Sequence, residues 1–138
     1  MLIVVTLMSL LFGISFPSLT AGIESLRISS ACDEIATAIN GALNRAERRQ
    51  QGVEILVLPH ENVVAVASFE PGHRRRVEMP PGVTIAGDQP RQFLVFPGSS
   101  PPRVAILLVN RRGDRRAVRI DPVSGAPLIE RLNPGQEP

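Results

Sequence analysis

The chain has 138 residues, a formal net charge of +2 and one cysteine. This length suits one small domain with an appended segment, and the single cysteine excludes an internal disulfide. All fifteen basic residues are arginine, and the chain has no Trp and no Tyr. The near-balanced charge and the shortage of aromatic residues do not favour nucleic acid as a general partner.

Residues 1–22 contain no charged side chain. As a helix rising about 1.5 Å per residue they would be roughly 33 Å long, enough to cross a hydrocarbon core of about 30 Å. We therefore predict that residues 1–22 form the transmembrane half of an N-terminal helix. A cleaved secretory signal is an alternative for the same run. An ordinary membrane anchor would explain the run, but not the helical pattern that follows it.

Residues 23–51 are predicted to continue this helix as an amphipathic half. Apolar residues recur three or four positions apart, which is the spacing of one helical face: Ile28, Cys32, Ile35, Ile39, Ala42 and Ala46. Arginines near the predicted end suit the negative end of the helix dipole. Gly52 is the expected residue just beyond the helix.

Residues 52–138 are predicted to form a β-rich globular domain. Short apolar runs separated by turn residues indicate strands at 53–58, 62–69, 73–79, 83–86, 92–96, 104–109, 117–120 and 128–132. The expected fold class is α+β. A long N-terminal helix, transmembrane and then amphipathic, would pack on a C-terminal antiparallel β-sandwich or curled sheet.

Several features of the first fifty-eight residues resemble a known family. They are the apolar run Leu2–Phe16, Gly13 and Pro17 four apart within the apolar segment, the triplet Pro17-Ser18-Leu19, and the ending LNRAERRQQGVEILV from Leu43. The stretch resembles the N-terminal helix of a type IV pilin or type II secretion pseudopilin. Its ending is close to the helix exit and first strand of the GspH/FimT group of minor pseudopilins.

The resemblance implies a structural function and no enzymatic activity. The chain would be a minor pseudopilin, a subunit of a type II secretion pseudopilus that serves protein export across the outer membrane. Its partners would be other pseudopilins through the N-terminal helix, and the inner membrane before assembly. The expected location is the bacterial inner membrane, in a single pass, with the globular domain in the periplasm.

Gly13 and Pro17 are the expected helix assembly and kink positions. Pro17 lacks the N–H that would bond the carbonyl of Gly13, and its ring crowds that carbonyl. A glycine there relieves some of the crowding and lets the backbone bend.

The chain departs from the family pattern at its start. Families of this type carry a leader-cleavage site, then a phenylalanine and a glutamate early in the mature helix, and none of these is present here. We expect the true start to lie upstream, in which case prepilin peptidase would be a further partner. A defective copy is the alternative.

No catalytic set is visible, and no cofactor or metal is expected. His60 and His73 are isolated, and Cys32 lies on the apolar helical stripe, where free Cys behaves as a small hydrophobe. Zinc would need several Cys or His ligands. The segment Asp121–Gly125 holds one carboxylate, too few for calcium, and is predicted to be a plain turn. Arg112-Gly113-Asp114 is expected at a hairpin tip rather than as an adhesion motif.

Arginines cluster on the predicted hairpin at 104–120. They are Arg111, Arg112, Arg115, Arg116 and Arg119, and strand alternation places Arg115 and Arg119 on one side with Arg116 opposite. Such a patch can bind phosphate or a protein partner. The alternative function is therefore a FimT-like minor type IV pilin that binds DNA for natural transformation. Against it, these arginines can pair with acidic neighbours such as Asp114, Asp121 and Glu130.

Overall fold

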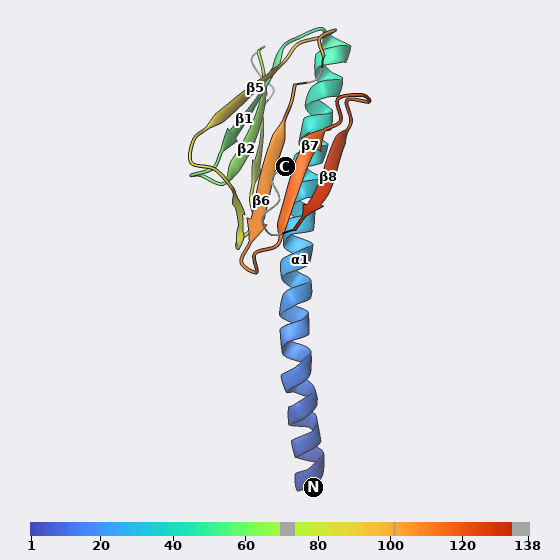
Figure 1. The fold of residues 1–138 in the computed structure, drawn as a ribbon, viewed down its shortest axis with the longest axis vertical. Helices are drawn as coiled ribbons and strands as arrows, with labels where there is room; N and C mark the ends of the chain where they lie inside the picture. The colour runs from blue at the N-terminus through green and yellow to red at the C-terminus, as the bar shows by residue number, and fades with distance from the viewer. Residues whose placement is uncertain (70–73, 101, 134–138) are drawn as a thin grey trace.

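In a computed structural model, the chain forms one long helix followed by short antiparallel strands (Figure 1). The structure describes residues 1–69, 74–100 and 102–133, without the side chains of residues 15–18, 20 and 21. The helix α1 spans Leu2–Arg49. The strands are β1 Val53–Leu58, β2 Val63–Ser68, β3 Arg74–Glu78, β4 Val83–Ile85, β5 Arg91–Val95, β6 Ala105–Asn110, β7 Arg115–Ile120 and β8 Pro127–Leu132.

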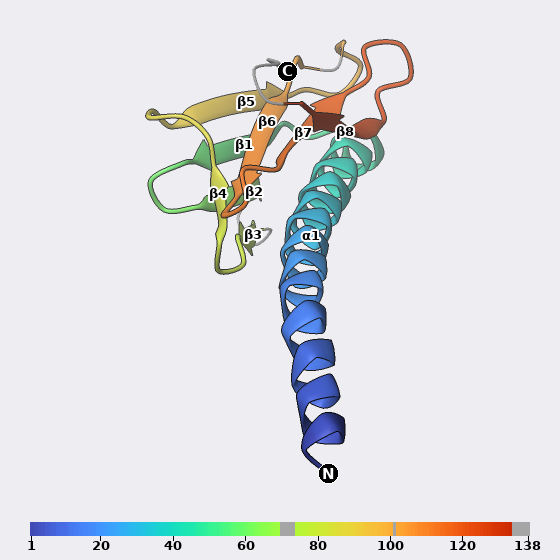
Figure 2. The same ribbon diagram turned by 60° about the horizontal axis from the view of Figure 1, so that its bottom comes forward.

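The strands form two four-stranded antiparallel sheets. One has the order β3-β2-β1-β5 and the other the order β4-β6-β7-β8. Both lie beside the C-terminal half of α1, and the N-terminal half projects beyond them (Figures 1 and 2). The predicted α+β class, with an N-terminal helix packed on antiparallel sheets, is confirmed.

One apolar core joins α1 to the inner faces of both sheets. Alternate residues of β1 are buried, as expected for a strand with one face inward. β6 is buried on both faces, because Ile106 and Leu108 join this core and Leu107 packs with Ala117 and Leu132 on the other side of the sheet. The helix contributes the stripe that its three-to-four spacing predicts, and Ile28, Ile35 and Ile39 have no exposed surface. Burying such a side chain contributes about 1.5–3 kcal/mol, so the stripe holds α1 on the sheets.

The helix ends before the glycine that the sequence indicates. Gln50 takes the left-handed conformation, with φ 53° and ψ 45°, and its N–H bonds the Ala46 carbonyl. The prediction that Gly52 takes this place is wrong. Gly52 instead lies beneath the ring of Phe69, where a Cβ would collide with the ring carbons. The glycine is needed for this close approach rather than for helix capping.

Asn62 and Asn110 fix two of the turns between strands. The side chain of Asn62 accepts a hydrogen bond from the Ile85 N–H at 3.2 Å, which ties the start of β2 to β4 in the other sheet. The Asn110 Oδ1 atom accepts hydrogen bonds from the N–H groups of Arg112 and Asp114, at 3.0 and 2.9 Å. These bonds close the predicted hairpin between β6 and β7.

The predicted transmembrane half of the helix is not confirmed. Over the residues that the structure describes, no helix offers a stretch that is both long enough and apolar enough to span a membrane. This finding contradicts the predicted single-pass inner-membrane location, and that prediction is wrong.

Candidate assembly site on the long helix

The N-terminal half of α1 has no packing partner among the described residues. Its large apolar side chains from Leu2 to Ile14 are all more than half exposed, and the helix there stands clear of both sheets (Figure 1). Glu24 is the first of the described side chains of α1 to be buried, at 7% exposed. Contact with the sheets therefore begins about halfway along the helix.

Exposed apolar residues run along α1 up to this point and just past it, on the face away from the sheets. Leu19 is 64% exposed, Ile23 49% and Leu26 70%. At about 100° per residue these three lie within about 60° of one another, and Ile28 in the core lies about 180° from Leu19. The helix thus presents one apolar face to the sheets and a second, separate apolar face outward.

The outward face includes residues of the free half of the helix. At the same angular position lie Val5, Met8 and Phe12, and Phe12 is 71% exposed. We call this surface the assembly stripe, defined as Val5, Met8, Phe12, Leu19, Ile23 and Leu26. The three- and four-residue steps along it are those of residues that line one side of a helix and contact a neighbouring helix.

The assembly stripe ends abruptly after Leu26. The next residues at the same angular position on the helix are Ser30, Thr37 and Asn44, all exposed and polar. A cavity of about 360 Å³ lies beside the end of the stripe, lined by residues that include Ile23, Leu26, Ala31 and Pro80. The apolar outward surface therefore spans the free half of α1 and about one turn of the half that contacts the sheets.

The two predicted kink positions lie within the free half. Gly13 is exposed, and a Cβ added there would meet nothing within 4 Å. The backbone is helical through both Gly13 and Pro17, and the side chain of Pro17 lies outside the described residues. The space around Gly13 leaves room for another helix to approach closely.

The five hairpin arginines do not form one patch. Arg116 points toward α1 and donates hydrogen bonds to the hydroxyls of Ser29 and Ser25, at 2.6 and 3.4 Å. On the opposite face of β7, Arg119 forms an ion pair with Glu130. The predicted separation of Arg116 from Arg115 and Arg119 is confirmed, because Arg116 shares its face with the core residues Val118 and Ile120.

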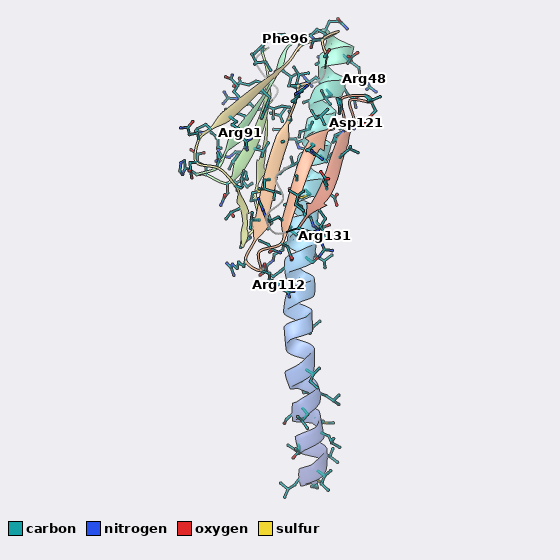
Figure 3. The ribbon with its side chains drawn as sticks, in the orientation of Figure 1. Arg48, Arg91, Phe96, Arg112, Asp121 and Arg131 are labelled. Carbon is teal, nitrogen blue, oxygen red and sulfur yellow. The ribbon has the colours of Figure 1, made fainter. Side chains whose placement is uncertain are left out.

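The other hairpin arginines lie nearer the surface. Arg111 and Arg112 are exposed and Arg115 is half-buried. The Arg111 side chain lies against Gly82, whose φ of +89° also favours glycine. Figure 3 shows Arg112 and Arg131 at the end of the sheets from which the free half of α1 projects. Among the described residues, Arg111, Arg112 and Arg115 have no ion pair, so three of the five predicted cations remain.

Groups that could carry chemistry are buried or engaged in turns. Burial raises the pKa of the Cys32 thiol from 9.0 to about 11, and the positive charge of Arg116 opposes this shift. Asp121 accepts hydrogen bonds from the Val123 N–H and the Ser124 hydroxyl, which lower the pKa of its carboxyl. Within the described part of the chain, no group of three or more His, Cys, Asp or Glu side chains could hold a metal ion.

Sequence reasoning missed two features of this region. It did not identify Glu24 as buried, although the helical spacing from Ile28 places it on the core face. Its Oε2 atom has no hydrogen-bond partner among the described residues. It also did not identify Leu26 as part of an outward apolar face, although the angular offset of Leu26 from Ile28 indicates one.

Comparison with protein-family models, with curated proteins and with solved structures finds no match to this chain. The resemblance to minor pseudopilins therefore stays a prediction that rests on the sequence alone.

Proposed function

We propose that this chain is a minor pseudopilin, a structural subunit of a type II secretion pseudopilus that serves protein export across the outer membrane. The single observation that carries the proposal is the assembly stripe, an outward apolar face of α1 that its own fold leaves uncovered. In this function the stripe packs against the same helix of neighbouring subunits.

Helix packing of this kind suits the physical character of the stripe. Large apolar side chains on a projecting helix expose surface that water disfavours, at about 25 cal/mol per Å². A neighbouring helix with the same spacing buries this surface with ridges of one helix in the grooves of the other. The polar residues from Ser30 onward would stay outside the interface, so the sheets remain available to other partners.

The two sheets have a separate role in this proposal. We take them as a β-sandwich-like domain that α1 supports through the shared core. They would present the surface that other components of the secretion system contact. The proposal needs no cofactor, and it assigns no catalytic role to Cys32, His60 or any carboxylate.

The alternative function, DNA binding for natural transformation, has no comparable observation in its favour. It depended on a patch of five hairpin arginines, and two of these, Arg116 and Arg119, are engaged within the fold. It remains a distinct outcome of the experiment that follows.

The test is deletion of the gene in its own host, followed by restoration of the full chain. We expect proteins normally released to the medium to remain in the cells after deletion, and their release to return on restoration. Intact secretion together with a loss of DNA uptake would contradict the proposal and favour the alternative.

A further inference from the structure

The outer face of the first sheet carries a shallow trough beside a row of arginines. The trough has a volume of about 360 Å³ and is lined by Glu54 and Leu56 of β1, Ala65 and Ala67 of β2, and Arg74–Arg76 of β3. We call it the β2 trough. It lies on the open face of the sheet, away from α1, and so is separate from the assembly stripe.

The register of the strands explains the shape of the trough. Ala67 pairs with Arg74 on one side and with Glu54 on the other. Ala65 in turn pairs with Arg76 and with Leu56. The small alanines of β2 thus form a floor between a wall of arginines and a wall made by β1. With strands about 4.8 Å apart, the two walls stand about 10 Å from each other, wide enough for one extended chain.

The carboxylates that pair with the arginine wall are solvent-exposed. Arg76 pairs with Glu61 and Glu78 at 3.6 and 3.5 Å, but these side chains are all more than half exposed. Such pairs contribute little and exchange readily. No ion pair of Arg74 is found within the described part of the chain. Arg75 pairs across the strands with the core residue Val66, so alternation places it on the other face of the sheet. Arg74 and Arg76 are therefore the two guanidinium groups that the trough offers to carboxylates.

Protection of a sheet edge explains only part of this arrangement. β3 is an edge strand, and charged residues on an edge strand discourage pairing with other chains. That role does not account for Ala65 and Ala67, because alanine is a poor strand former and neither packs in the core. Small residues at these two positions keep the trough open.

We propose that the β2 trough binds an extended acidic segment of a partner protein. Carboxylates at alternate positions of an extended chain are about 7 Å apart, as are Arg74 and Arg76, which lie two residues apart on one face of β3. Apolar side chains of the same segment would contact Leu56 and the two alanines.

The chemistry of the trough favours a peptide over nucleic acid. Its lining contains no aromatic side chain on which a base could stack. Glu54, which accepts a hydrogen bond from Gln92 at 2.6 Å, places a negative charge on the opposite wall. A continuous phosphate backbone would be repelled there, whereas a segment with acidic residues on one side only would not.

The test uses the full chain in non-ionic detergent and a fluorescein-labelled peptide, Thr-Glu-Val-Glu-Thr, with binding followed by fluorescence anisotropy. We expect this peptide to bind, and the peptide with both glutamates replaced by glutamine to bind roughly tenfold more weakly, since both charge pairs are lost. Replacing both arginines, Arg74→Ala with Arg76→Ala, should weaken binding roughly tenfold, since each exposed charge pair contributes modestly.

Two further variants separate a defined site from general positive charge. Ala65→Leu fills the trough without changing the charge, and it should weaken binding by a similar factor. Arg111→Ala with Arg112→Ala removes the same charge from the β6–β7 hairpin and should leave binding unchanged. Equal loss in this control, equal binding of the glutamine peptide, or no binding at all would overturn the proposal. So would tight binding of duplex DNA that Ala65→Leu abolishes.

Discussion

The guanidinium of Arg116 on β7 donates a hydrogen bond to the hydroxyl of Ser29 on α1, with 2.6 Å between Nη1 and Oγ. This bond joins the helix to the second sheet at the end of the core nearest the free half of α1. Replacing Arg116 with alanine removes this hydrogen-bond donor. The serine hydroxyls, which are half-buried, then lack that partner. We expect Arg116→Ala to lower the free energy of unfolding by about 1–2 kcal/mol.

Urea unfolding measures this loss, and Arg112→Ala is the matched control. Arg112 is exposed at the hairpin tip, so its replacement should change the free energy of unfolding by less than about 0.5 kcal/mol. Equal effects of the two substitutions would show that the bond to α1 does not stabilise the fold.

A fragment that begins at Gly22 should fold without the free half of the helix. Every core residue of α1 among the described side chains lies at or after Ile28, and both serines that bond Arg116 are retained. We expect a monomer by size-exclusion chromatography with the β-sheet circular dichroism of the full chain. In this fragment, Ile35→Asp with Ile39→Asp should abolish folding, because each places an unpaired charge in the core. A folded double variant would show that the packing face is misassigned.

The stability of the fragment should fall between about pH 9 and pH 11. Burial raises the pKa of the Cys32 thiol from 9.0 to about 11 in the folded state. Below pH 9 the thiol is protonated whether or not the chain is folded, so stability is unaffected. Between the two values only the unfolded chain ionises, which favours unfolding by roughly 2 kcal/mol at the upper end.

The composition makes this pH effect specific. The chain has no Tyr, and its basic residues are all arginine, so no other side chain titrates in that range. Cys32→Ala should remove the fall in stability measured by urea unfolding at each pH. A fall of the same size in Cys32→Ala would show that another group causes it.

Much of the fold follows from the sequence, because its signals are local. The runs at 53–58 and 128–132 match β1 and β8 to within one residue, since turn residues bound them closely. The pairing of β1 with β5 and of β4 with β6 could not be predicted in this way. Strands that pair across long stretches of chain leave no local pattern.

The surface assignments were less predictable than the fold. The sequence indicates that Arg116 and Arg119 belong to a basic patch, because it does not show that Ser29 and Glu130 lie opposite them. The assembly stripe was hidden for a related reason. The angular offset between Leu26 and Ile28 separates two faces of the helix, but only the placement of the sheets on one side of α1 shows that the face of Leu26 stays exposed.

The hairpin arginines should not give the chain useful affinity for DNA. With Arg116 and Arg119 engaged, three cations remain, so the slope of log affinity against log salt could reach only about −2.7. We expect no binding of duplex DNA near physiological salt, measured by fluorescence anisotropy with a labelled duplex. Clear binding that Arg111→Ala with Arg112→Ala abolishes would instead favour the DNA-uptake function.

The most direct measurement compares two charge substitutions on either side of the end of the assembly stripe. Leu26→Asp and Ser30→Asp each add one negative charge to an exposed position on the same face of α1, one turn apart. Neither touches the core, so the Gly22 fragment should remain folded with either substitution. In the full chain, sedimentation velocity in non-ionic detergent reports on association between subunits. We predict that Leu26→Asp abolishes the oligomers and that Ser30→Asp retains them. Oligomers that persist in Leu26→Asp, or a full chain that never forms them, would contradict assembly through this stripe.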